Sequence, residues 1–299
     1  MRAAAGDLVV SQPAISAAVA TLSRELDVEL LERAGRGVRP TPAGREFAAY
    51  AADVLGLLER GRRAAHDIQT GGGPALTIAA VTTAAESFVP PLMRAFAEAH
   101  PEVSLTLEVG NRDHVLAMVC NHQADLAIGG RPPGHERIAA RPILANELLL
   151  ISAPDDALVR RATVSPAELS GRRWLLREPG SGTRAVNEEY LAVTGIEVRR
   201  MTLGSNGAIK QAVRAGLGLS FISRAAVSTE LDAGLLGVIP VSPGPQARDW
   251  YALRSAVGPQ RPVTTDFISF VSSPAATRIL AGGVPGGQSG PDAYSNVAS

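Results

Sequence analysis

Hydroxyl, amide and small side chains are spaced along one early segment so that they could touch nucleic-acid bases. The segment from Ser11 to Gly44 reads SQPAISAAVATLSRELDVELLERAGRGVRPTPAG. Ser11 is a preferred helix N-cap, and Pro13 suits a first helical turn. Gln12 and Ser16 can hydrogen-bond base edges, while small neighbours allow close approach to a major groove. A helix with this pattern can lie in the major groove of double-stranded DNA.

A basic run follows that helix. Arg33-Ala-Gly-Arg-Gly-Val-Arg39 predicts a hairpin whose guanidinium groups could bind phosphates or enter a minor groove. The residues expected at the DNA are Ser11, Gln12, Pro13, Ser16, Ala17, Arg36 and Arg39. The spacing alone leaves an alternative open, because core helices and solvated basic loops share the same pattern.

Other hydroxyl and amide groups stand where predicted strands end and helices begin. Unpaired N–H groups and the helix dipole favour an anion at such positions, and open α/β sheets bind ligands there. We therefore expect a small carboxylate- or phosphate-bearing metabolite to be held by Thr82, Thr83, Gly129, Arg131, Ser181, Thr183, Arg184, Ser205 and Asn206. Taken one at a time, each hydroxyl or amide is better explained as an ordinary N-cap, and only the repetition of the pattern at several strand ends favours a ligand site.

Catalytic and metal-binding patterns are missing from the sequence. The histidines and Cys120 have no metal-ligand spacing, and neither G-x-S-x-G nor H-E-x-x-H occurs. Gly180-Ser-Gly-Thr183 lacks the lysine of a P-loop, although its backbone could still hold an anion. We expect no metal, no cofactor and no enzymatic activity.

Composition limits where DNA could bind and where the protein works. The 299 residues are 45% hydrophobic with a formal net charge of zero, so affinity for DNA must come from a local patch. The single cysteine indicates a reducing compartment, and no signal peptide or membrane span is visible. We expect a cytoplasmic protein that does not engage membranes.

Three strings in register resemble one known family. SQPAIS, LLER and TPAG at these distances resemble the DNA-binding end of the LysR-type transcriptional regulators. The resemblance implies a winged helix-turn-helix, a dimerising linker helix and a bilobal effector domain that resembles periplasmic binding proteins. It also implies a homodimer or homotetramer on a promoter pseudo-palindrome, with the effector in the interlobe cleft. Ala17 and Ala18 depart from the polar residues usual there, which leaves fewer base contacts.

Beyond residue 75 the chain alternates predicted strands and helices. Strands are expected over 76–81, 103–109, 125–128, 147–152, 173–176, 197–203, 218–222 and 250–253. Helices are expected over 86–99, 112–122, 183–194, 206–215 and 264–271. Such alternation predicts an α/β fold with parallel sheets covered on both faces.

These elements give a domain organisation in four parts. Residues 1–41 form a partial winged helix-turn-helix, 42–70 the linker helix, 75–272 the effector domain and 273–299 a disordered tail. Subdomain I covers about 75–145 and 250–272, and subdomain II about 146–249. The helix-turn-helix has an almost absent first helix. By ordinary helix lengths we expect roughly 20 residues to precede Met1, lost through a misassigned start codon or a truncation.

Alternatives to a regulator modulated by an anionic metabolite remain open. One is a solute-binding protein without DNA binding, which would share the bilobal fold. Another is a truncated regulator unable to bind DNA. The missing signal peptide and the segment 11–44 favour the regulator over the solute-binding protein.

Overall fold

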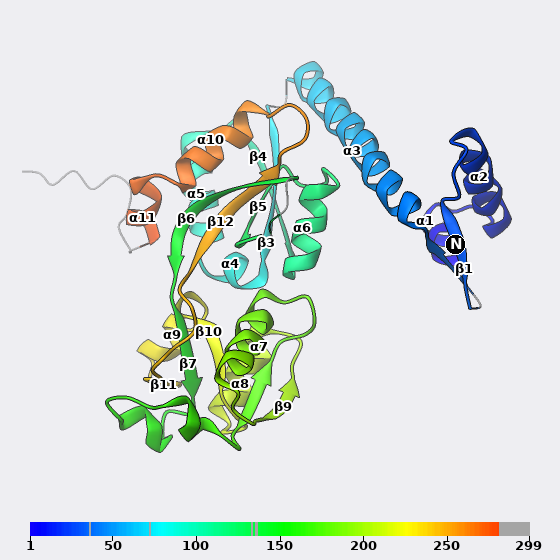
Figure 1. Cartoon of the computed structure of the whole chain (residues 1–299). Coiled ribbons are helices and arrows are strands. Elements are labelled where there is room, and N and C mark those ends of the chain that lie inside the picture. The colour runs from blue at the N-terminus through cyan, green and yellow to red at the C-terminus, as the bar shows by residue number, and fades with distance from the viewer. Residues whose placement is uncertain (36, 72, 133, 135–136, 281–299) are drawn as a thin grey trace, which may run out of the picture. The chain divides into compact units, whose positions relative to one another are not determined.

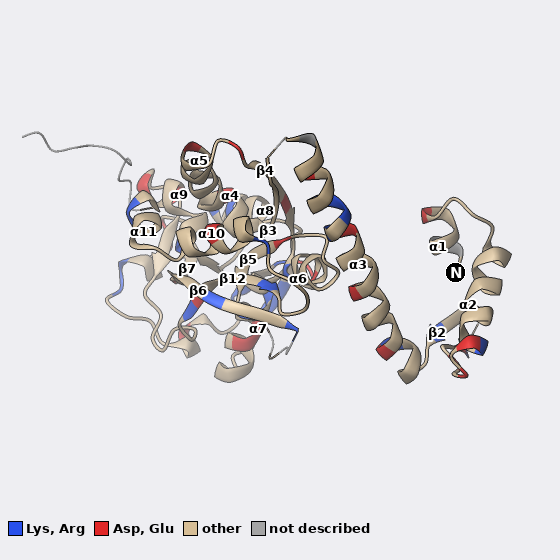
Figure 2. Ribbon diagram, turned by 90° about the horizontal axis from the view of Figure 1, so that it is seen from above, with Lys and Arg blue, Asp and Glu red and all other residues tan. Residues whose placement is uncertain are grey.

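The computed structural model describes residues 1–35, 37–71, 73–132, 134 and 137–280 (Figure 1). The chain divides into two compact units, Met1–Arg63 and Ala64–Ser299. No helix within the described ranges is long and apolar enough to cross a membrane. Acidic and basic residues both occur along α3 and across the second unit (Figure 2).

The first unit contains the helices and hairpin that the sequence predicts. α1 (Arg2–Asp7) and α2 (Gln12–Glu25) precede an antiparallel hairpin of β1 (Leu31–Ala34) and β2 (Gly37–Pro40). α3 (Pro42–Thr70) follows, and its last residues belong to the second unit. Ser11 caps α2 by accepting a hydrogen bond from the Ala14 N–H at 3.3 Å. The predicted hairpin and long helix are confirmed, whereas Arg36 lies outside the described residues.

Thr41 and Gly44 join the hairpin to α3. The Thr41 hydroxyl accepts from the Gly44 N–H at 2.9 Å and donates to the Glu29 carbonyl at 2.6 Å. A Cβ atom on Gly44 would collide with the Leu30 carbonyl oxygen. The TPAG string therefore has a steric basis, because only glycine allows this approach of the helix to the preceding backbone.

Subdomain I is built on a five-stranded sheet in the order β4-β3-β5-β12-β6. β3 pairs in parallel with β4 and β5, whereas β12 is antiparallel to both β5 and β6. The strands are β3 (Ala75–Val81), β4 (Ser104–Gly110), β5 (Leu126–Gly130), β6 (Ile138–Asn146) and β12 (Arg248–Ser255). The sheet expected to be parallel is therefore mixed, because β12 returns to it in the opposite direction.

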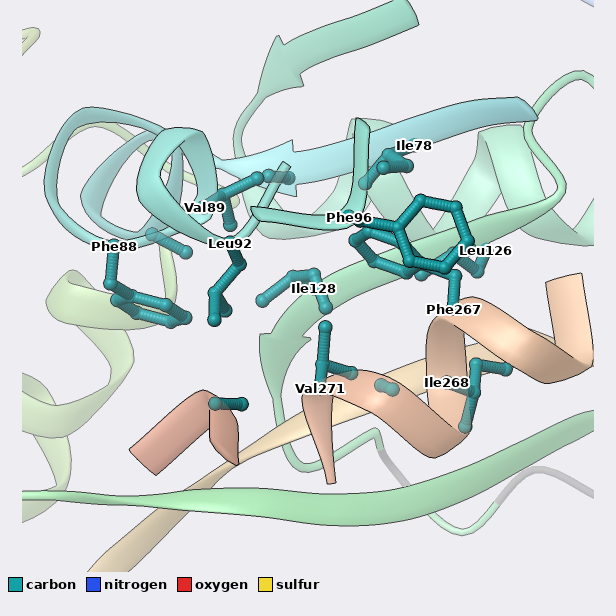
Figure 3. Close-up of a cluster of buried hydrophobic side chains, with 14 of the residues drawn as sticks. Ile78, Phe88, Val89, Leu92, Phe96, Leu126, Ile128, Phe267, Ile268 and Val271 are labelled. Atoms are coloured by element: carbon teal, nitrogen blue, oxygen red, sulfur yellow. The ribbon is translucent and has the colours of Figure 1, made fainter. Parts of the chain in front are cut away.

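Helices cover both faces of this sheet, as predicted. On one face, Ile78, Leu126 and Ile128 pack against α5 (Val89–Ala99) and α10 (Pro262–Val271), with Phe96 and Phe267 in edge contact (Figure 3). On the other face, α6 (Arg112–Cys120) covers small side chains, which include Ala79 and Ala127. Alternate side chains along each strand thus enter different cores.

Subdomain II contains a three-stranded sheet and a two-stranded sheet, with helices on two sides. β7 (Leu148–Ser152) is central and antiparallel to β10 (Ser220–Ser223) and β11 (Gly237–Ile239), while β8 (Arg173–Leu176) and β9 (Arg199–Thr202) pair in parallel. α7 (Gly182–Thr194) covers the face that contains Trp174 and Phe221. α8 (Asn206–Arg214) covers the opposite face at Leu175 and Ile222. The short elements are η1 (Ala157–Arg160), η2 (Pro166–Leu169), η3 (Arg224–Ala226) and α9 (Ser228–Asp232).

The long strands β6 and β12 run side by side toward subdomain II (Figure 1). β6 was not predicted from the sequence, and it contains Pro142. Proline is tolerated here because β6 is an edge strand whose register shifts opposite Trp250 and Tyr251.

Two further expectations need correction. The helix expected over 86–99 is two helices, α4 (Thr82–Ser87) and α5, because the chain leaves helical geometry at Phe88 before Pro90 and Pro91. The expected disordered tail begins instead with α11 (Pro274–Leu280), whose Ala276 packs into the subdomain I core. Residues 281–299 lie outside the described residues.

Candidate functional site

Within the described residues of the second unit, a cavity of about 200 Å³ lies between the two subdomains. Subdomain I contributes the ends of β3, β4 and β5, subdomain II contributes α7, and the crossovers contribute residues from β6 and β12. Sites for drug-sized ligands commonly measure about 300–1,000 Å³. This cavity therefore suits a small metabolite.

Helix N-termini from both subdomains meet at this cavity. Asn111 caps α6 by accepting from the His114 N–H at 2.9 Å, and Ser181 caps α7 by accepting from the Arg184 N–H at 3.5 Å. Both caps line the cavity, as do Thr82 and Thr83 at the start of α4. Backbone N–H groups at such ends carry partial positive charge. The cavity is therefore suited to a negatively charged group.

The subdomains approach closely beside these helix ends. Gly180 has φ +82°, and a Cβ atom there would lie 2.8 Å from an Asp113 carboxylate oxygen. A Cβ on Gly182 would lie 3.8 Å from the Arg112 side chain. Gly180, just before α7, thus allows the first turn of α7 to face the first turn of α6, whereas a Cβ on Gly182 would make only an ordinary contact.

Four arginines and two carboxylates line the cavity. Arg248, on the crossover strand β12, forms an ion pair with Glu189 of α7. Arg112 donates to the Arg131 carbonyl at 3.0 Å, and no carboxylate within the described residues pairs with Arg112 or Arg131. Two guanidinium charges are thus left for a ligand.

Arg177 occupies a buried position in the cavity wall, with its side chain 4% exposed. It donates two hydrogen bonds to Glu178, at 2.7 and 2.9 Å, and another to the Asn206 amide oxygen. Burial raises the pKa of Glu178, but hydrogen bonds from Arg177 and the backbone, together with the charges of Arg177 and Arg184, outweigh it and leave the pKa below its ordinary value. Glu178 therefore stays ionised near neutral pH and compensates the buried guanidinium.

Asn146 adds an unsatisfied polar atom to the cavity wall. No donor within the described residues reaches its buried amide oxygen. A buried acceptor without a partner is costly and marks a place where a ligand or water completes the hydrogen bonding.

The first unit presents a different surface. Gln12 lies exposed at the start of α2, and its amide reaches the Ser16 hydroxyl at 3.4 Å. Arg39 is exposed on the hairpin and donates to Glu32 at 2.7 Å. Polar side chains at a helix start and cations on a neighbouring hairpin are the groups used for base and phosphate contacts, respectively.

Comparisons with known proteins match both units. Residues 69–275 match the LysR substrate binding domain, and residues 1–45 match the bacterial regulatory helix-turn-helix protein of the lysR family. The chain belongs to the LysR family of bacterial transcriptional regulators. As a member of the LysR family, it is a transcriptional regulator with a DNA-binding head and an effector-binding domain.

Similar LysR-family proteins match most of the chain. The HTH-type transcriptional regulator CbbR of Rhodospirillum rubrum is 34% identical over 92% of this chain and 91% of its own. The RuBisCO operon transcriptional regulator of Allochromatium vinosum is 34% identical over 91% of this chain and 90% of its own. The regulatory domain of CcmR from Synechocystis PCC6803, solved in complex with 2-PG, aligns with a TM-score of 0.63 and 29% identity. That alignment covers 67% of this chain and 96% of the CcmR regulatory domain.

The effector residues predicted from sequence divide into two groups. The first group lines the cavity and consists of Thr82, Thr83, Arg131, Ser181 and Thr183. The second group is absent from the lining formed by the described residues and consists of Gly129, Arg184, Ser205 and Asn206. Arg184 bonds Glu188 instead, Ser205 caps α8, and Asn206 is buried behind Thr83.

Sequence reasoning also missed several lining residues. Asn111 and Arg112 follow β4 as Thr82 follows β3, so the rule of polar residues after strand ends would have found them. Asn146, Arg248 and Trp250 reach the cavity from the crossover strands. No local pattern marks these three, because only the return of the chain between subdomains brings them to the site.

Proposed function

We propose that this LysR-family regulator binds a small anionic metabolite in the cavity between its subdomains and that this changes its binding to promoter DNA. The observation that carries the proposal is the cavity itself, where helix N-termini converge with Arg112 and Arg131, neither of which has a carboxylate partner among the described residues. The CcmR regulatory domain, which holds 2-PG, supports a small anion as the class of ligand.

The proposed contacts follow from donors that line the cavity. Thr82, Thr83, Ser181 and Thr183 supply hydroxyl groups, and Arg131 supplies a guanidinium. Hydrogen bonds to charged groups are the strong ones, so oxygens of a carboxylate or phosphate gain most here. The unsatisfied Asn146 oxygen favours a ligand that also carries a hydroxyl group.

Calorimetry on the full chain tests this proposal. The titrants are 2-PG, inorganic phosphate and small hydroxycarboxylates, with glycerol as the uncharged reference. Replacing Arg131→Gln removes a charge from the cavity and should weaken anion binding roughly tenfold or more. Arg214→Gln, the same change on the exposed last turn of α8, should leave affinity unchanged. Equal binding by both variants would place the site elsewhere.

The DNA contacts are proposed for α2 and the hairpin. In this proposal Gln12 and Ser16 contact base edges, Ser11, Pro13 and Ala17 lie beside them on α2, and Arg39 of β2 contacts phosphates. Glu32 competes with DNA for the Arg39 guanidinium. Because an exposed ion pair contributes little to stability, its exchange for a phosphate is easy.

Binding to a pseudo-palindromic duplex and to random duplexes separates these roles. Arg39→Gln should weaken binding to both and lower the salt slope by about 1, whereas Gln12→Ala should lose only sequence preference, at about 1–3 kcal/mol. Glu32→Gln frees Arg39 and should strengthen binding to both. Loss of affinity in Glu32→Gln would show that Glu32 orients the arginine rather than competing for it.

A further inference from the structure

Asn206 is fully buried behind the cavity wall and connects two residues that line it. Its amide oxygen accepts from Arg177, and its amide nitrogen donates to the Thr83 hydroxyl oxygen at 2.7 Å. Thr83 belongs to α4 of subdomain I, whereas Arg177 and Asn206 belong to subdomain II. The Asn206–Thr83 bond therefore joins the two subdomains at the site.

The orientation of the Asn206 amide is fixed by chemistry. A guanidinium can only donate hydrogen bonds, so the atom that faces Arg177 must be the amide oxygen. The opposite atom, which faces Thr83, is then the amide nitrogen with its hydrogens. Arg177 is held in place by its two hydrogen bonds to Glu178. The donors and acceptors are therefore fixed along the series: Arg177 donates to Asn206, and Asn206 donates to Thr83.

This direction decides what the Thr83 hydroxyl can do. A hydroxyl has one hydrogen to donate, and here its oxygen already accepts from Asn206. Within the described residues, no acceptor receives the Thr83 hydroxyl hydrogen, and Ser87 bonds the Thr83 main-chain oxygen instead. Because Thr83 lines the cavity, that hydrogen is available to a bound molecule.

We infer that Asn206 is a positioning residue that makes the Thr83 hydroxyl a hydrogen-bond donor toward the ligand. The site thereby selects oxygen acceptors, such as carboxylate or phosphate groups, over ligand N–H and O–H donors. This inference rests on the proposed function, since it assigns a specificity determinant to the same cavity. It also ties ligand selection to the arrangement of the subdomains, because the bond that orients Thr83 forms between them.

Asn206→Asp tests the inference with almost no change in shape. One carboxylate oxygen remains on Arg177, while the other faces Thr83 and takes the hydroxyl hydrogen away from the cavity. We expect the affinity of the full chain for 2-PG or inorganic phosphate to fall roughly tenfold or more in calorimetry. A urea titration of each variant shows whether its fold is intact.

A double-mutant cycle separates this role from charge repulsion or general damage. With Thr83→Val there is no hydroxyl to reorient, so adding Asn206→Asp should cost no further affinity. Thr83→Ser keeps the hydroxyl and should keep the full sensitivity to Asn206→Asp. If Asn206→Asp lowered the anion affinity as much in the Thr83→Val background as in the unmodified chain, the inference would be overturned, although the anion site itself would stand.

Asn206→Ala serves if the aspartate variant does not fold. It leaves the hydroxyl free to rotate, so we expect a smaller loss of affinity that again disappears in the Thr83→Val background. If the unmodified chain binds neither anion, the proposed function fails and this inference fails with it.

Discussion

Asn187 illustrates how a single buried amide holds one wall of the site. Its oxygen accepts from the Trp174 indole N–H at 2.6 Å and from the Phe221 N–H at 2.9 Å. Its nitrogen donates to the carbonyls of Thr183 and Phe221 at 2.8 and 2.9 Å. All its hydrogen-bonding capacity is thus used to fix α7 on the sheet, which keeps Thr183 at the cavity.

Tyr190 lies beside that network and gives a prediction about alkaline pH. Burial raises the pKa of Tyr190 to about 12 from 10.0. Between these values the folded chain keeps a proton that the unfolded chain loses, so stability falls as pH rises through this window. In Tyr190→Phe this loss is absent. The stability advantage of the unmodified chain should therefore be constant at pH 7–9 and shrink above pH 10 in urea titrations. If the difference in unfolding free energy between the unmodified chain and Tyr190→Phe stayed constant up to pH 12, the prediction would be wrong.

Local sequence rules found donors at the cavity but did not distinguish ligand contacts from structural ones. Thr83 and Asn206 each follow a strand and begin a helix, so both fit the same rule. Asn206 is nevertheless a structural residue, because its amide oxygen is already bonded to Arg177 and its amide nitrogen to Thr83. These partners are distant from Asn206 in the sequence, so no local pattern reveals them.

At the scale of elements, α3 carries an exposed apolar stripe. Tyr50, Val54 and Leu58 recur every four residues and are 64%, 65% and 70% exposed. Such spacing places them on one helix face, and a row of large exposed apolar groups marks a protein contact. The neighbouring Leu57 is half-buried. We propose that the stripe packs against a second copy of α3.

Leu58→Asp tests the stripe, because it would bury an unpaired charge in a helix pair. We expect light scattering to report half the mass of the unmodified chain. Val193→Asp, the same kind of change on an apolar α7 residue that is 81% exposed, should keep the original mass. An unchanged mass for Leu58→Asp would remove this face of α3 from the interface.

At the scale of the whole molecule, the order of helices and strands was largely predictable, whereas their directions were not. Short, mostly apolar runs predicted β3, β5 and β7. The antiparallel return of β12 depends on two crossovers between subdomains, which leave no mark in local periodicity. Lining residues on the crossovers were missed for the same reason.

Effector and DNA should be coupled reciprocally if the cavity regulates the DNA-binding unit. A ligand that changes DNA affinity by some factor must have its own affinity changed by the same factor when DNA is bound, commonly about 5–150-fold. The test uses the full chain and a duplex selected by it from random sequence. Calorimetry of 2-PG or phosphate with and without the duplex gives one factor, and DNA titrations with and without the anion give the other.

Thr83→Val should weaken anion binding but leave anion-free DNA affinity unchanged, whereas Thr106→Val, on an exposed face of β4, should change neither. Unequal factors would mean that a second process, such as a change of assembly, accompanies binding.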